Sequence, residues 1–397
     1  MKKKIVVISS RFLYPVVGGD RLRIYQICKS LSKDFNVTFI CLTDKNSDLS
    51  YEIPDDDIFE RFEVVYLPKW KSWINCIISL VTDVPLQVAY YKSKPFTTKV
   101  AEVSFGADFI LCHLIRTAQF SYGLGITAFM EMTDIISFNY SRIKNTSIYS
   151  RFDIRRLVYK FESSRLKKYE YNVLKKFKKS FLVSDVDLSF FKSFFEIPND
   201  KVEIFSNGVD IHKYQYDFNR NERNIVFIGN MQSYPNIEAV FHFVKVILPL
   251  IRAKVPDAKF KIVGRISERD SFELQKYEGV VVTGEVLNVT NVSNGAVGIC
   301  PMRIGAGIQN KILEYMALGL PVVTSEVGFE GLSARRGIDL LVADNDTEFA
   351  LSVVKLMTYR DFAEDIAINA RCYVEKMHSW DKILYSMNRL ILSSSNN

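Results

Sequence analysis

Short apolar runs alternate with longer helical patterns along the whole chain. Most runs are continuous and rich in β-branched residues, which is typical of strands in a parallel sheet covered on both faces. In the first half, the predicted strands fall at residues 5–8, 37–42, 64–67, 109–112, 127–132, 181–183 and 202–205. The clearest helical patterns between them cover residues 20–32 and 152–179.

The second half repeats this alternation. Predicted strands fall at residues 224–228, 260–263, 280–283, 296–300, 321–324 and 340–342, and predicted helices at residues 237–254, 347–359 and 361–378. Because strands and helices alternate in both halves, we predict an α/β protein with two Rossmann-like, doubly wound domains. The polar stretch 212–223 is the natural linker, so the domains are expected at residues 1–210 and 211–379.

Length and composition agree with this picture. A chain of 397 residues suits two domains, and 48% hydrophobic with 24% charged residues is typical of a globular protein. No apolar run reaches the roughly 18 residues of a spanning helix, and residues 5–8 are too short for the apolar part of a secretory leader. The six cysteines and four histidines show no metal-like spacing. We therefore expect a cytoplasmic protein without a metal or other cofactor.

The positive charge is concentrated in the first half. Residues 1–205 contain 31 Lys and Arg against 23 Asp and Glu, a net of +8, whereas the remainder has 21 against 22. Much of the excess lies in the stretch 151–179. This stretch is either a solvated helix face or a basic face that meets an anionic membrane or a phosphorylated acceptor. Nucleic acid is disfavoured as a partner because no nucleic-acid motif accompanies the charge.

The most informative segment is PMRIGAGIQNKILEYMALGLPVVTS, residues 301–325. Its glycines allow a tight turn and close approach to a ligand, and a helix is predicted over residues 308–318. The free N–H groups at the start of that helix form an anion site. Lys311 and Glu314 share one helix face, which suits a nucleotide whose diphosphate meets Lys311 and whose ribose meets Glu314. We expect both side chains to serve the ligand, so that alanine at either position leaves stability unchanged.

This segment resembles the donor-binding helix of retaining GT-B glycosyltransferases of family 4, in the bacterial exopolysaccharide branch. The matching positions are Arg303, Gly305, Gly307, Lys311, Glu314, Gly319 and Pro321. The resemblance implies two Rossmann-like domains facing a central cleft, with residues 380–397 returning to the N-terminal domain. It also implies metal-independent transfer, with retention, of a hexose-type sugar from a nucleotide diphosphate sugar to a hydroxyl acceptor. The expected acceptor is a glycan or a lipid-linked saccharide at the inner face of the plasma membrane, in surface polysaccharide biosynthesis.

The resemblance also points to candidate residues in the first domain. Gly18 and Gly19 follow the first strand, where the family has a loop that touches donor phosphates or acceptor, although a plain turn explains them equally. His113 ends a predicted strand, where open α/β sheets bind ligands, and is either the donor-contacting histidine that the resemblance implies or a structural histidine of the fold. Asp134 ends another strand, as an acceptor-binding residue or base, or simply as a helix N-cap.

In the second domain, Gly229 and Arg265 end predicted strands and join the candidate donor site, with Asn236 expected to cap the helix at residue 237. One departure from the family concerns the sugar. The common motif has a first glutamate where this chain has Ala306. We expect the backbone from Gly305 to Gln309, including Ile308, with the side chains of Gln309 and Asn310, to replace it.

Two other functions fit the same architecture. A GT-B nucleotide-sugar 2-epimerase would use the donor without an acceptor. A non-catalytic nucleotide-sugar-binding subunit of a polysaccharide complex would explain the missing glutamate. A nicotinamide dehydrogenase is disfavoured because no G-x-G-x-x-G follows a predicted strand.

Overall fold

The computed structural model describes residues 2–16, 18–145, 154–214, 218, 224–286, 288–293, 295–305 and 307–394. It divides into two compact units, Met1–Ser206 with Leu384–Asn397, and Asn207–Ile383. From the sequence, we predicted these boundaries between residues 210 and 211 and between residues 379 and 380. Each unit contains one all-parallel sheet, as predicted.

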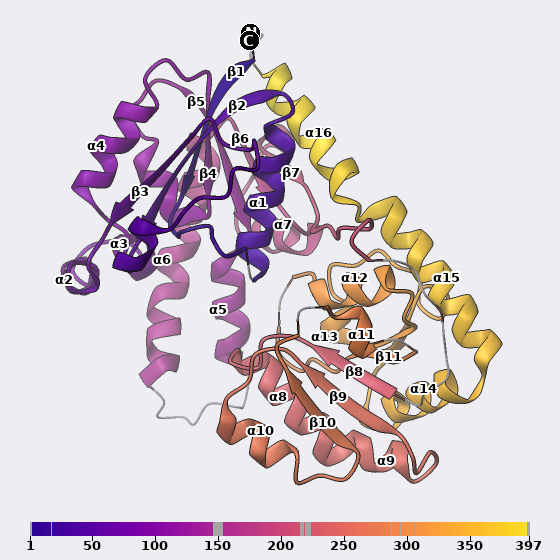
Figure 1. Cartoon of the computed structure of the whole chain (residues 1–397). Helices are drawn as coiled ribbons and strands as arrows, with labels where there is room; N and C mark the ends of the chain where they lie inside the picture. Colours follow the sequence, from indigo (N-terminus) through magenta and orange to yellow (C-terminus); the bar gives the residue numbers. More distant parts are fainter. Residues whose placement is uncertain are drawn as a thin grey trace. The chain divides into compact units, whose positions relative to one another are not determined.

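The first unit has a seven-stranded sheet in the order β3-β2-β1-β4-β5-β6-β7 (Figure 1). Val6 and Ile8 of β1 pack with α4 and α6 in one apolar cluster, so these helices cover one face. The order reverses between β1 and β4, which is where doubly wound sheets bind ligands. The strands are β1 Lys3–Ser9, β2 Phe35–Thr43, β3 Arg61–Tyr66, β4 Phe109–His113, β5 Thr127–Thr133, β6 Lys179–Leu182 and β7 Val202–Ile204.

The helices of this unit begin where local signals place them. α4 begins after Ser93, whose hydroxyl accepts from the N–H of Phe96, and Pro95 occupies its first turn. The α-helices are α1 Gly19–Leu31, α2 Lys69–Ser79, α3 Leu86–Ala89, α4 Lys94–Val103, α5 Ile136–Asn145, α6 Ile154–Lys176 and α7 Asp185–Lys192, and 3-10 turns cover Asn46–Ser50, Ile115–Phe120 and Asn199–Lys201.

The first N–H groups of helix α5 donate to carboxyl groups that α6 and α7 supply. The N–H of Ile135 donates to Asp187 at 2.9 Å, and the N–H of Ile136 donates to Glu170 at 2.8 Å. The alternative in which Asp134 caps this helix is therefore wrong, because α6 and α7 supply the acceptors.

The second unit has a six-stranded sheet in the order β10-β9-β8-β11-β12-β13. Its order reverses between β8 and β11. The strands are β8 Asn224–Ile228, β9 Lys259–Val263, β10 Val280–Gly284, β11 Val297–Cys300, β12 Val322–Ser325 and β13 Leu341–Ala343. The helices are α8 Tyr234–His242, α9 Leu248–Arg252, α10 Glu268–Leu274, α11 Thr290–Ser293, α12 Asn310–Ala317, α13 Glu326–Phe329, α14 Asp346–Thr358 and α15 Arg360–Met377, followed by α16 Trp380–Ser393.

Helices α8 and α9 are joined through a π-helical turn, Phe243–Ile247. Pro249 has no N–H to continue the helical ladder, which accounts for the irregular turn before it. Within the described residues this helix, Tyr234–Arg252, is the one that is long and apolar enough to cross a membrane. Its residues Val240, Phe243 and Ile247 are buried in the core of the second unit, so it is a core helix.

Helix α12 is fixed to its sheet by a ring seated against a glycine. A Cβ added to Gly298 of β11 would lie 2.6 Å from the Tyr315 ring. The Tyr315 hydroxyl accepts from the N–H of Ile228 in β8 at 2.8 Å. Tyr315 thus ties α12 to both strands at the point where the sheet order reverses.

Candidate active site

The predicted donor residues gather at the carboxyl ends of β8 and β11. Gly229 follows β8, and its N–H donates to the carbonyl of Val263 at 2.9 Å. A Cβ on neighbouring Gly264, whose φ is +124°, would lie 2.0 Å from the Gly229 carbonyl oxygen. Only glycine allows these two turns to approach so closely. The segment 301–305 follows β11 and leads towards α12.

Lys311 has a buried stem with an amine that is held by polar groups. Its side chain is 8% exposed, and its Nζ lies 2.7 Å from Asn236 Oδ1 and 3.7 Å from Met302 Sδ. The amine also lies 4.3 Å from the centre of the Phe227 ring. Burial lowers the pKa of Lys311. An anion beside the amine would counter this effect by favouring the charged form.

Asn236 does not cap its helix. α8 begins two residues earlier, at Tyr234, and the Asn236 side chain donates to the Asn230 carbonyl at 2.9 Å while accepting from Lys311. Asn236 therefore positions Lys311, a role that the sequence did not reveal. The signal was a polar residue following a Ser-Tyr-Pro turn at the end of a strand.

The glycine loop before α12 leaves polar groups for a ligand. Gly307 has φ of +67°, and its carbonyl accepts from Gln309 Nε2 at 3.4 Å. Among the described residues, Asn310 Oδ1 is buried and has no hydrogen-bond partner. Ile308 is buried against the core. Ala306 lies outside the described residues, so its predicted role stays a prediction.

Glu314 is half-buried one turn after Lys311. Burial raises its pKa to about 7, while the charges of Lys213 and Lys311 act in the opposite direction. Lys213 belongs to the segment that crosses into this unit. Arg371 of α15 holds that segment, donating to the carbonyls of Ile211 and Tyr214 at 3.1 and 2.8 Å and also to the carbonyl of Ala317 in α12. Arg371 thus ties the crossing segment, which contains Lys213, to α12, which contains Glu314. The sequence analysis did not identify Arg371.

The two predicted arginines have other partners in this structure. Arg303 lies 3.0 Å from Glu238 Oε1 and 3.1 Å from His242 Nδ1, both on α8. Arg265 lies 2.9 Å from Glu285 Oε1. Both guanidinium groups are about half exposed, so an incoming phosphate can compete for them.

In the first unit, His113 forms part of a buried ionic cluster. Strand register pairs His113 with Ser9 of β1 and Glu131 of β5 at the carboxyl end of the sheet. His113 Nδ1 lies 2.8 Å from Glu131 Oε2, and Arg23 Nε lies 2.8 Å from Glu131 Oε1. Desolvation alone would raise the pKa of Glu131, but Arg23 and His113 lower it to about 2. Glu131 is therefore ionised, and His113 must carry its proton on Nδ1.

This arrangement leaves the other ring nitrogen of His113 for a ligand. Within the described residues, His113 Nε2 has no hydrogen-bond partner. Two further contacts hold the cluster, since the hydroxyl of Thr133 donates to Glu131 at 2.9 Å and Arg23 donates to the Phe205 carbonyl at 2.8 Å. Glu131 and Arg23 thus orient His113, and the sequence reasoning named neither in this role.

The remaining predicted residues of this unit also follow the carboxyl ends of strands in the first sheet. Burial, with Asp187 next in size, raises the pKa of Asp134 to about 7, which suits a proton acceptor. Gly18 has φ of +99° in the turn before α1, and Gly19 begins that helix. In the described part of the chain, His, Cys, Asp and Glu form no group of three suited to a metal ion. Metal independence and ligand contacts at these residues stay predictions.

Comparison with known proteins finds a family match within the second unit. Residues 222–359 match the family model described as "Glycosyl transferases group 1". This stretch contains the glycine loop and the Lys311 cluster, which consists of Lys311 with its neighbours Asn236, Met302 and Phe227. An uncharacterized 44.6 kDa protein in the cps region of Klebsiella pneumoniae is 23% identical over 408 residues, covering 97% of this chain and 98% of the relative.

Solved structures match the whole chain. Sucrose-phosphate synthase from Thermosynechococcus elongatus superposes with a TM-score of 0.73 at 13% identity, over 98% of this chain and 99% of its own. Anabaena HepE in complex with UDP and glucose gives 0.69 at 13% identity, over 98% and 100%. With the two parallel sheets, these likenesses confirm the predicted GT-B fold. The family match and the fold together support a glycosyltransferase.

Proposed function

We propose that this protein transfers a hexose-type sugar from a nucleotide diphosphate sugar to a hydroxyl acceptor, as a family-4 enzyme of surface polysaccharide biosynthesis. The observation that carries the proposal is the Lys311 cluster at the reversal of the second sheet. It combines a held cation, a helix N-terminus and a glycine turn, within the stretch that matches the glycosyltransferase family. The acceptor is a glycan or a lipid-linked saccharide.

The chemistry needs a group that stabilises the leaving diphosphate. Lys311, held by Asn236, lies in the first turn of α12, where the free N–H groups of the helix N-terminus would add to its charge. Arg303 would exchange Glu238 and His242 for phosphate oxygens. Such preorganised donors act on the developing charge without a metal ion.

The other candidate residues position the nucleotide and the sugar. The Glu314 carboxylate would accept hydrogen bonds from the ribose hydroxyls. The open acceptor of Asn310, with Gln309 and the backbone of the glycine loop, would hold sugar hydroxyls in place of the family's first glutamate. His113 Nε2 would contact the transferred sugar, and Asp134 would contact the acceptor hydroxyl. We propose retention of configuration because the donor motif is of the retaining type.

Two features of the relatives support this assignment. The HepE structure holds UDP and glucose, so a protein of this fold binds a nucleoside diphosphate and a sugar. The Klebsiella relative lies in a cps region. A cytoplasmic location, with access to acceptors at the inner membrane face, agrees with both.

A ligand panel and a product assay test the proposal. UDP, GDP and ADP, each free and as its glucose conjugate, are screened by thermal shift, because a ligand at 100 times its Kd stabilises by about 2.7 kcal/mol. The donor found is then incubated with and without saccharide acceptors. Transfer that appears only with acceptor, with the anomeric configuration of the donor kept in the NMR spectrum, is the expected result.

The controls separate the rival functions. Arg303→Gln should weaken the thermal shift, whereas Arg360→Gln, an exposed arginine of α15 in the same unit, should not. Conversion of the donor sugar without any acceptor would instead establish an epimerase. Donor binding without turnover on any acceptor would favour the non-catalytic subunit.

A further inference from the structure

Helix α2 presents its apolar side to solvent and its serines to the protein. Its two buried residues are Ser72 and Ser79. The side chains that stand out from the helix and the turn after it are 38–88% exposed, and they are Trp70, Trp73, Ile74, Ile77, Ile78, Leu80, Val81 and Val84. Two of the chain's three tryptophans are among them. A helix that serves only its own fold buries the opposite face.

Polar contacts hold α2 in this orientation. Asn75 donates to the carbonyl of Lys92 at 2.8 Å. Arg165 of α6 donates to the carbonyls of Ser79, Thr82 and Val84, satisfying groups at the end of α2. Arg165 is itself paired with Glu162 at 2.6 Å, and Glu162 accepts from the N–H of Leu86. The exposed apolar face is therefore a fixed surface, and folding of the unit does not use it.

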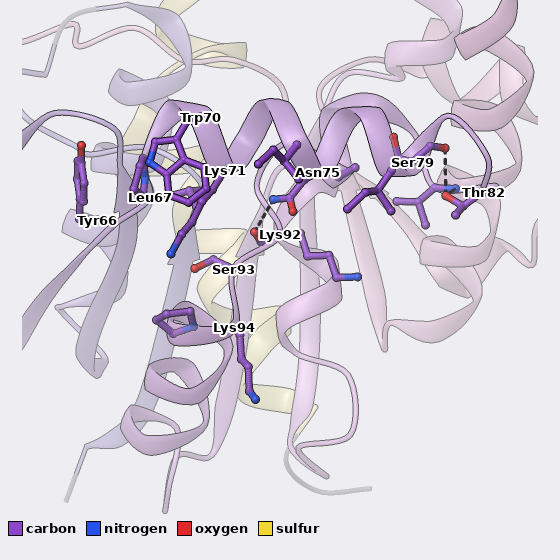
Figure 2. Close-up of a pocket in the computed structure, with 16 residues that line it drawn as sticks. Tyr66, Leu67, Trp70, Lys71, Asn75, Ser79, Thr82, Lys92, Ser93 and Lys94 are labelled. Atoms are coloured by element: carbon purple, nitrogen blue, oxygen red, sulfur yellow. Dashed lines mark hydrogen bonds between the residues drawn. The ribbon is translucent and has the colours of Figure 1, made fainter.

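A groove of about 430 Å³ runs beneath this helix. Figure 2 shows Trp70 and Lys71 on the α2 side, with Lys92 just before α4 and Lys94 at its start. The lining is mainly apolar and includes no Asp or Glu. Within the described residues, none of these three lysines forms an ion pair. Lys71 lies 5.4 Å from the ring of Trp70.

Several lysines of the basic stretch that the sequence singled out, at the end of α6 and the start of β6, lie against aromatic rings or an acid. Lys175 lies 4.2 Å from the centre of the Tyr171 ring, and Lys176 lies 4.2 Å from that of Tyr122. Lys179 is paired with Glu203 at 2.5 Å. At α2, by contrast, three lysines without an ion pair among the described residues accompany a wide exposed apolar surface.

We infer that α2 and its groove form a docking surface for an anionic lipid bilayer. Tryptophans, large aliphatic side chains and lysines on one exposed helix face are the composition of helices that lie in the membrane interface. The apolar face would enter the acyl region, while Lys71, Lys92 and Lys94 meet lipid phosphates at the mouth of the groove. The charge complementarity favours this occupant over a second apolar protein surface. The inference does not depend on the proposed transfer reaction.

Flotation with vesicles tests the inference on the full-length protein. Wild type should float with phosphatidylglycerol vesicles and at least tenfold less with phosphatidylcholine vesicles, and high salt should weaken the binding. Ile77→Ser/Val81→Ser should reduce binding at least tenfold, because these side chains are 66% and 88% exposed and lie outside the groove lining. Lys71→Gln/Lys92→Gln/Lys94→Gln should do the same.

Matched controls decide between surfaces. Lys175→Gln/Lys176→Gln/Lys178→Gln removes the same charge from the α6 region and should leave binding within twofold of wild type. Phe105→Ser removes an apolar side chain that is 93% exposed elsewhere in the same unit and should also bind normally. Loss of binding in the α6 variant alone, or flotation of wild type with neither vesicle, would overturn the inference.

Tryptophan fluorescence gives an independent readout. Trp70 and Trp73 are exposed, whereas Trp380 is 6% exposed and serves as an internal reference. Phosphatidylglycerol vesicles should shift the emission to shorter wavelength, and brominated acyl chains should quench it, in wild type but not in Trp70→Ser/Trp73→Ser. If wild type instead forms a dimer that Ile77→Ser/Val81→Ser abolishes, and no vesicle-dependent shift occurs, the occupant is a second copy of the chain and the inference fails.

Discussion

The Lys311 side chain contributes to both stability and the candidate site. Its stem packs in the core of the second unit, while its amine is held at the carboxyl end of the central strands. The expectation that alanine leaves stability unchanged does not allow for this buried stem. Removing the stem would open a cavity beside Phe227 and Met302, at a cost of about 2–3 kcal/mol. A useful substitution must keep the volume and remove only the charge.

We predict that Lys311→Met lowers transfer turnover by about 100-fold or more, since one preorganised electrostatic donor contributes on that scale. The melting temperature without ligand should stay close to that of wild type, because methionine fills a similar volume. Lys311→Ala, as the comparison, should lose both turnover and stability. Steady-state kinetics and thermal melting of both variants check this. Normal turnover in Lys311→Met would remove Lys311 from the reaction.

At the scale of the elements, helix α5 depends on an acid buried in α6. Glu170 accepts from the N–H groups of Ile136 and Ser137 at 2.8 and 3.3 Å. Its side chain is fully buried, and burial raises its pKa to about 8. The folded state thus binds a proton that the unfolded state releases near its ordinary pKa of 4.5. Stability from this group is complete below pH 4.5 and is lost as pH rises towards 8.

We therefore predict that Glu170→Gln flattens the decline of stability between pH 5 and 8, by as much as about 1.4 kcal/mol per pH unit. Glutamine keeps the carbonyl that caps α5 and cannot ionise. Asp134, whose pKa is also raised, should leave a residual slope of the same sign. Urea unfolding across this pH range measures the effect, with the exposed Glu196→Gln as the control. An unchanged slope in Glu170→Gln would show that this acid does not couple folding to pH.

Elements were more predictable than their contacts. The apolar runs located the strands of both sheets, because a strand covered on both faces must be apolar along its length. Helix α2 was not among the predicted helices, and the structure exposes its apolar residues. The Glu131–Arg23 pair joins residues 108 positions apart, and Asn236 reaches Lys311 across 75. Local spacing carries no signal for such pairs, so the positioning residues of the site needed the structure.

At the scale of the whole molecule, the chain leaves the first unit after Ser206 and re-enters it at Leu384. Helix α16 begins in the second unit, where Trp380 packs against Gly208, and its later turns belong to the first. There Leu384, Met387 and Ile391 are buried. Each unit otherwise has its own apolar core, so a local change in one should register mainly there.

Asn388 tests this division, because it fastens α16 to the first unit. Its side-chain amide donates to the Ser30 carbonyl and to the Asp34 carboxylate, both at 2.9 Å, and the residue is 2% exposed. We predict that Asn388→Ala speeds hydrogen exchange in residues 28–36 and 384–393 by about 5- to 150-fold, the range set by losing a buried hydrogen-bonding group worth about 1–3 kcal/mol. Exchange in residues 224–377 should not change.

Asn369→Ala, which removes a single hydrogen bond to the Asp365 carbonyl within α15, is the matched control and should act only locally. Faster exchange in β8, β11 and α12 of Asn388→Ala would show instead that the two units share one stability.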